Sequence, residues 1–135
     1  MASYDASPGV GVYATIRPHE GETMTEPSGS PVVHTASAEW KPLPIPGVSV
    51  KSLRRDASGH STSLVRFEPG TRFPAHNHPA GEEVFVVEGD FQVGRHRLTA
   101  GDYIYTPPGE KHAASTEGGC LIIVTLPRPV EFLEG

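Results

Sequence analysis

From Val32 onward, glycines and prolines cut the chain into short segments, and this regular interruption limits what the chain can fold into. The sequence contains 15 glycines and 14 prolines. Prolines break every candidate helix, and no segment repeats apolar residues at helical spacing. Short runs bounded by turn residues predict an all-β sandwich or barrel. The expected strands span residues 32–36, 48–53, 62–69, 72–78, 82–89, 91–98, 102–108, 111–116 and 120–126, and a short helix is expected near 129–135.

The first 31 residues differ from the rest of the chain. Their apolar residues repeat neither at helical nor at strand spacing, and the segment is rich in turn formers. We interpret residues 1–31 as a loose arm, either partly disordered or able to exchange with another copy. Because 135 residues is the size of one domain, residues 32–135 are expected to form that domain.

Composition excludes several classes of function. The net charge is −5, and the lysines and arginines are scattered, so the chain offers no basic surface for nucleic acid or for an anionic membrane. No apolar run approaches the roughly 18 residues of a membrane span. The N-terminus lacks a secretion signal, and a single cysteine, Cys120, allows no internal disulfide, which together favour a cytoplasmic location. A small-molecule or protein partner fits this composition best.

The stretch "HNHPAGEE" contains the side chains most able to carry chemistry. Alternation along a strand points His76 and His78 to the same side. Glu82 or Glu83 begins the next strand, and His112 follows the turn "TPPGEKH". Three imidazoles and one carboxylate on a rigid β scaffold are typical of a divalent metal site with positions left for water or substrate.

The spacing of these residues resembles the two sequence motifs of the cupins. The first motif, G-x5-H-x-H-x3-E-x6-G, is matched in full by residues 70–89. The second, G-x5-P-x-G-x2-H-x3-N, is matched by residues 101–116 except that Thr116 stands in place of the final Asn. The resemblance implies an all-β cupin jelly-roll barrel, also called a double-stranded β-helix, of the small RmlC-like kind. It also implies that His76, His78, Glu82 and His112 bind the metal.

Which glutamate is the ligand depends on how the first motif is aligned. Glu82 keeps the six-residue gap to Gly89, whereas Glu83 uses a permitted longer spacing after His78 but shortens that gap. The sequence around both motifs resembles the ChrR-like cupins, which include the zinc-binding cupin domain of an anti-sigma factor. This resemblance favours Glu82. The family resemblance also implies a homodimer, with the arm before Val32 as the donor of an exchanged strand.

The ligand set does not select one metal. Iron(II) and zinc head the candidates, and manganese, nickel and copper also accept imidazole and carboxylate. With iron(II), we expect dioxygenase chemistry on a small oxygenated metabolite. With another metal, an isomerase, hydrolase or decarboxylase is expected. Glu82 could act as a permanent ligand or as a catalytic base. The alternative to an enzyme is a non-catalytic zinc or ligand-binding module such as a sensor.

Residues outside the motifs carry weaker expectations. Arg95, His96 and Arg97 lie near a hairpin turn and are expected to be solvated, and Cys120 is expected in the core. The candidates for lining a cavity near the metal are Arg66, Phe73, Phe85, Phe91, Tyr103 and Tyr105.

Overall fold

The computed structural model describes residues 29–133 and confirms the all-β prediction. The described part contains one 3-10 turn, η1 (Thr35–Ser37), and ten strands. The strands are β1 (Lys41–Pro42), β2 (Val48–Arg55), β3 (Ser61–Phe67), β4 (Arg72–Asn77), β5 (Glu82–Val93), β6 (His96–Thr99), β7 (Tyr103–Thr106), β8 (Lys111–Ser115), β9 (Cys120–Leu126) and β10 (Glu131–Phe132). No helix in residues 29–133 is long and apolar enough to cross a membrane.

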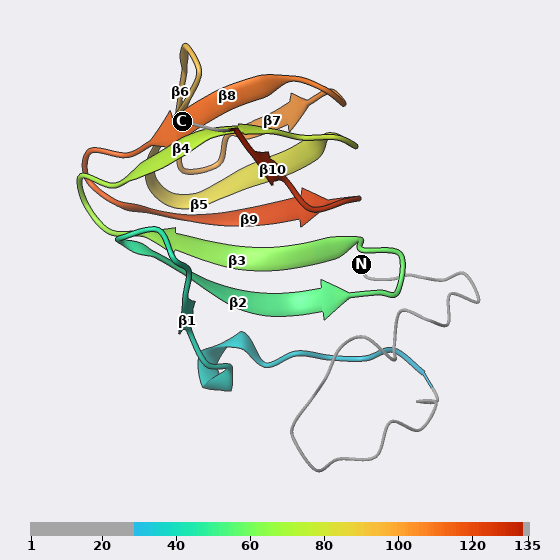
Figure 1. The fold of residues 1–135 in the computed structure, drawn as a ribbon. Coiled ribbons are helices and arrows are strands. Elements are labelled where there is room, and N and C mark those ends of the chain that lie inside the picture. Colours follow the sequence, from blue (N-terminus) through green and yellow to red (C-terminus); the bar gives the residue numbers. More distant parts are fainter. Residues whose placement is uncertain (1–28, 134–135) are drawn as a thin grey trace.

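The strands form a curled antiparallel sheet that folds over on itself through β5 (Figure 1). The first part of β5 pairs with β7 and β9, and its last residues pair with β6 and β8. One layer therefore runs β1-β2-β3-β9-β5, and the other continues β5-β8-β4-β10. This two-layered arrangement is that of a cupin jelly-roll barrel, as predicted from the sequence motifs.

Gly89 lies in β5 where the strand passes from one layer to the other. Its φ angle is +85°, and the pairing of β5 with β9 shifts register between Val86 and Glu88. A Cβ atom at this position would collide with the backbone carbonyl of Gly119. Only glycine fits both the backbone angle and the close approach, which explains why the first motif ends with this residue.

The core lies between the two layers, and alternate residues of β9 and of each end of β5 contribute to it. Val84 and Val86 of β5 pair with Val124 and Ile122 of the neighbouring strand β9, and all four are buried. Cys120 is also buried, as expected from the sequence, and burial raises the pKa of its thiol to about 11. The thiol is therefore protonated at neutral pH and acts as a small core side chain.

Thr116, which replaces the Asn of the second motif, has a structural role at the end of β8. Its hydroxyl donates a hydrogen bond to the carbonyl of Asp90 at 2.6 Å and accepts one from the amide of Gly119 at 2.9 Å. The side chain is buried and lies between the bend of β5 and the turn into β9. The departure from the motif therefore keeps a polar link at this position.

Three local expectations are wrong, and one lies outside the described residues. The expected break between strands 82–89 and 91–98 is absent, because β5 continues through Gly89 to Val93. Residues 32–36 form no strand, because local hydrogen bonds close the turn η1 instead. The expected C-terminal helix is replaced by β10, which pairs with β4 so that Phe132 stacks on Phe73 at 5.6 Å between ring centroids. Residues 1–28 of the expected arm lie outside the described part of the chain.

Candidate metal centre

His76 and His112 face each other across two neighbouring strands. They are directly opposed in the pairing of β4 with β8, which shifts register between Phe73 and His76. The bulge brings His76 to the inner side of the barrel, where it is 4% exposed. The ring centroids of His76 and His112 lie 5.3 Å apart, so residues 36 positions apart in the chain meet through strand register.

His78 is the first residue after β4 and is fixed to the turn that precedes β8. Its amide contacts the carbonyl oxygen of Glu110 at 3.3 Å, and its own carbonyl accepts hydrogen bonds from the amides of Gly81 and Gly109 at 3.1 and 2.8 Å. The side chain is fully buried. Its ring centroid lies 4.5 Å from those of both His76 and His112. The three imidazoles therefore form one compact cluster.

Backbone carbonyls determine which nitrogen each of two rings offers. Nδ1 of His76 lies 2.6 Å from the carbonyl oxygen of Pro74, and Nδ1 of His78 lies 3.2 Å from that of Glu110. Since a carbonyl oxygen only accepts, each Nδ1 carries the proton and each neutral ring presents an unprotonated Nε2. Such a hydrogen bond from Nδ1 to a carbonyl fixes the orientation of the ring and leaves Nε2 free to bind a metal.

The ring nitrogens of the three histidines lie close together, and one of them has no hydrogen-bond partner among the described residues. Ligand atoms of the three histidines all lie within 4.8 Å of one another. Nε2 of His78 is buried and makes no hydrogen bond within the described part of the chain, although Oε1 of Glu82 lies 3.2 Å away. A buried lone pair without a donor is costly, so this residue set fits a divalent cation.

The two adjacent glutamates point to opposite sides of β5. Oε1 of Glu82 lies 3.2 Å from Nε2 of His78 and 4.0 Å from Nε2 of His112. Glu83 is exposed on the outer surface, where its carboxylate accepts a hydrogen bond from the Tyr103 hydroxyl at 2.8 Å. Of the two glutamates, Glu82 therefore lies beside the histidines, in line with the alignment that keeps the gap to Gly89.

The electrostatics keep two of the imidazoles neutral. Burial, together with the neighbouring rings, lowers the pKa of His112 to about 4 and also lowers the pKa of His76. Burial acts in the same direction on His78, but the Glu82 carboxylate and the carbonyl of Glu110 outweigh it and raise the pKa of His78. At neutral pH, His76 and His112 therefore present uncharged nitrogens to a cation.

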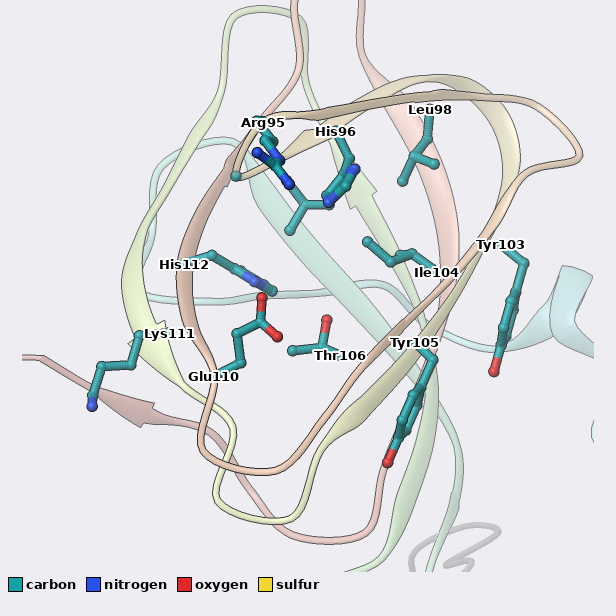
Figure 2. A pocket seen from close by; sticks show the side chains of 12 residues that line it. Arg95, His96, Leu98, Tyr103, Ile104, Tyr105, Thr106, Glu110, Lys111 and His112 are labelled. Atoms are coloured by element: carbon teal, nitrogen blue, oxygen red, sulfur yellow. The ribbon is translucent and has the colours of Figure 1, made fainter.

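A cavity of about 580 Å³ opens beside His112 (Figure 2). Its walls come from the end of β5, the turn into β6, β6, β7 and residues 110–112. Arg95 and His96 belong to this lining although both are exposed. Their solvation was expected, but their place at the cavity was not, because it depends on where the β5–β6 hairpin lies in the fold. Alternation along "HRL" was the one available signal, since it puts His96 and Leu98 on one side.

Of the six residues expected to line a cavity near the histidines, Tyr103 and Tyr105 do so, and Arg66, Phe73, Phe85 and Phe91 do not. Phe73 packs edge-on against His76 at 4.8 Å between ring centroids, and Phe91 is in the core. Tyr103 and Tyr105 belong to the lining through β7 but are more than half exposed, and Figure 2 shows them on the far side of the cavity from His112. Phe85 is 42% exposed beside them on the outer face.

A protein-family model described as the ChrR cupin-like domain matches residues 28–128. The chain belongs to this family. A protein of Arabidopsis thaliana described as DNA damage-repair/toleration protein DRT102 is 36% identical to this ChrR-like cupin over 81 residues. The match covers 55% of the cupin chain and 25% of the Arabidopsis protein, so the chain spans about a quarter of that relative.

Solved structures share the fold of this ChrR-like cupin. A putative acetylacetone dioxygenase from Methylibium petroleiphilum aligns with a TM-score of 0.74 at 20% identity, over 82% of this chain and 85% of that one. The anti-sigma factor ChrR of Rhodobacter sphaeroides, solved in complex with SigE, aligns with a TM-score of 0.60 at 22% identity, over 67% and 49% of the two chains. At these identities the similarity establishes the cupin fold.

Proposed function

We propose that this ChrR-like cupin is a metal-dependent enzyme that acts on a small oxygenated metabolite, with dioxygenase chemistry as the leading reaction type. The observation that carries the proposal is the position of His112. It belongs to the histidine cluster and also lines the cavity of about 580 Å³. A cluster that only stabilised the fold would have no need of an opening wide enough for a small molecule.

In this proposal, His76, His78, His112 and Glu82 hold one divalent ion. That ion would supply Lewis-acid chemistry or, as iron(II), redox chemistry. The remaining tasks belong to the chain: the cavity brings the substrate to the side of the cluster where His112 lies, and the carbonyl contacts of His76 and His78 keep their rings in place. Glu82, close to two of the rings, can hold a proton when it is not a ligand.

The description of the structural neighbour from Methylibium petroleiphilum is the reason for testing dioxygenase chemistry first. The test has two steps. Metal content is first measured by elemental mass spectrometry on untagged protein. The protein is then loaded with iron(II) under anaerobic conditions, and oxygen uptake is followed with β-diketones, catechols and thiols. The matched controls are His112→Ala, which removes a proposed ligand, and Glu83→Gln, which changes an outward carboxylate.

About one equivalent of iron, or uptake that needs iron, a substrate and His112, supports the proposal. Uptake that is equal in the wild-type protein and in His112→Ala would contradict it, because the reaction would then not depend on the cluster. Tightly bound zinc with no oxygen uptake in any state would move the assignment to a zinc-dependent hydrolase or isomerase, or to a non-catalytic domain.

The second candidate function is a non-catalytic zinc or ligand sensor. Membership of the ChrR cupin-like family favours it, since ChrR is an anti-sigma factor that was solved bound to SigE. A sensor with a permanently closed metal site predicts slow metal exchange and no binding of small molecules at the cluster. The open cavity at His112 is the reason for ranking this candidate second.

A further inference from the structure

The cavity beside His112 has one polar wall and one apolar wall. Val93, Leu98 and Ile104 make its apolar side, while Arg95 and Glu110 bring charged groups. In Figure 2, Arg95 and His96 extend from the β5–β6 hairpin toward the side where His112 and Glu110 lie. Lys111 also contributes to the lining, but its ammonium group points away from His112 (Figure 2).

The hairpin tip is fixed against the strand that carries His112. The Gly94 amide donates a hydrogen bond to the carbonyl of Ala113 at 3.1 Å. A Cβ atom placed on Gly94 would lie 4.0 Å from the Cβ of His112. Val93 and His96 are paired, so Gly94 and Arg95 form a two-residue turn and Arg95 is held one position from this contact. The backbone of Arg95 is therefore held beside the cavity whose lining it joins.

Arg95 is the cationic side chain that enters this cavity. Among the described residues, it makes no hydrogen bond and no ion pair, so its donors are available to a ligand. A guanidinium group matches the two oxygens of a carboxylate, and such charge-assisted pairs are among the stronger hydrogen bonds. The whole chain has a net charge of −5, so general attraction of anions does not explain a preference for them at this point.

We infer that Arg95 is a specificity-determining residue: it binds the carboxylate of a small substrate whose apolar group lies against Val93, Leu98 and Ile104. This inference rests on the proposed function, because it names the class of substrate that would enter from the cavity. An α-hydroxy or α-keto carboxylate with an apolar side group has the required shape, since its oxygens and its apolar group lie on opposite sides.

The experiment compares two probes of nearly the same shape, mandelate and its neutral amide, mandelamide. Binding to zinc-loaded protein is measured by isothermal titration calorimetry, and zinc content is measured on the same samples. The variants are Arg95→Gln and Arg97→Gln. Arg97 belongs to the same hairpin, but alternation places it opposite His96 and Leu98 and outside the cavity lining, so its substitution is a matched control for charge.

We expect wild-type protein and Arg97→Gln to bind mandelate more tightly than mandelamide. Arg95→Gln should weaken mandelate binding by about tenfold or more, from the loss of a charge-assisted hydrogen-bonded pair, while mandelamide binding and zinc content stay unchanged. Equal affinities for the two probes, equal loss in both arginine variants, or no mandelate binding to zinc-loaded wild-type protein would overturn the inference.

The two proposals fail in different ways. If wild-type protein holds zinc but Arg95→Gln binds mandelate as well as wild type does, the role of Arg95 is wrong and the metal centre stands. If no metal binds, the proposed function fails. The same titration on metal-free protein then tests Arg95 alone, and the absence of an Arg95-dependent preference for mandelate would overturn its role as well.

Discussion

Two donors of His78 contact a single acceptor, the backbone carbonyl oxygen of Glu110: the amide at 3.3 Å and Nδ1 at 3.2 Å. Glu110 lies two residues before His112, so this double contact ties the first sequence motif to the second. It fixes the direction of the His78 ring through the backbone. The barrel therefore contributes its own contacts to the position of His78 beside His76 and His112.

Removal of a single proposed ligand should release metal without unfolding the protein. We expect His112→Ala and Glu82→Gln to lose most bound metal, because His112 and Glu82 are proposed ligands, both within 4.0 Å of a partner in the cluster. Glu83→Gln should keep wild-type metal content, since Glu83 is bonded to Tyr103 on the outer surface. Elemental mass spectrometry gives the content, and circular dichroism checks the fold. Metal retained by Glu82→Gln but lost from Glu83→Gln would reverse the assignment.

The histidines should differ in how much they stabilise the metal-free barrel. His78→Ala removes a fully buried side chain and its contact with the Glu110 carbonyl, so we expect a loss of about 2–4 kcal/mol in the free energy of unfolding. His112→Ala opens onto an existing cavity and should cost clearly less. Urea denaturation in the presence of a chelator measures both. If both variants lost the same free energy of unfolding, the contacts between His78 and the Glu110 carbonyl would not contribute to stability as expected.

The sequence was sufficient to predict the barrel and to single out three histidines that cluster and the glutamate that lies beside them, because motif spacing and strand alternation are local properties. His76 and Glu82 could be assigned to one site only because the motif relates them. The C-terminal strand was missed because β10 forms through pairing with β4, a contact between distant residues. The place of Arg95 was missed for the same reason: its turn is visible in the sequence, but the packing of that turn against His112 is set by the hydrogen bond between Gly94 and Ala113.

Gly81 should be needed to place Glu82. Its φ angle is +88°, and a Cβ there would lie 2.9 Å from the carbonyl oxygen of Thr106. Gly101 has a similar φ of +94° with nothing within 4 Å, so it provides a matched control. Gly101→Ala should cost about 1–2 kcal/mol from backbone strain alone, whereas Gly81→Ala should cost more.

Because Glu82 follows Gly81 directly, Gly81→Ala should also weaken metal binding, and Gly101→Ala should not. Metal affinity is measured by competition with a chromophoric chelator, and stability by urea denaturation. If the two alanine variants had the same metal affinity, the turn before Glu82 would have no part in forming the centre.

Protonation of Asp90 should lower the stability of the barrel in acid. Its carboxylate accepts hydrogen bonds from the amides of Glu117 and Gly118 at 2.9 and 2.8 Å, and chiefly the Glu117 bond holds its pKa below the ordinary value of 3.8. Because the folded-state pKa is the lower one, this stabilisation is complete above about pH 4 and is lost as the pH falls through the folded-state pKa.

At pH 7, Asp90→Asn should cost about 1 kcal/mol, since an amide oxygen can keep only part of these bonds. Urea denaturation from pH 7 down to pH 3 should show the difference between wild-type protein and Asp90→Asn shrinking at the acid end, while Glu88→Gln, which alters an exposed carboxylate in the same strand, follows wild type throughout. A difference that stays constant with pH would mean that Asp90 acts through packing and not through its charge.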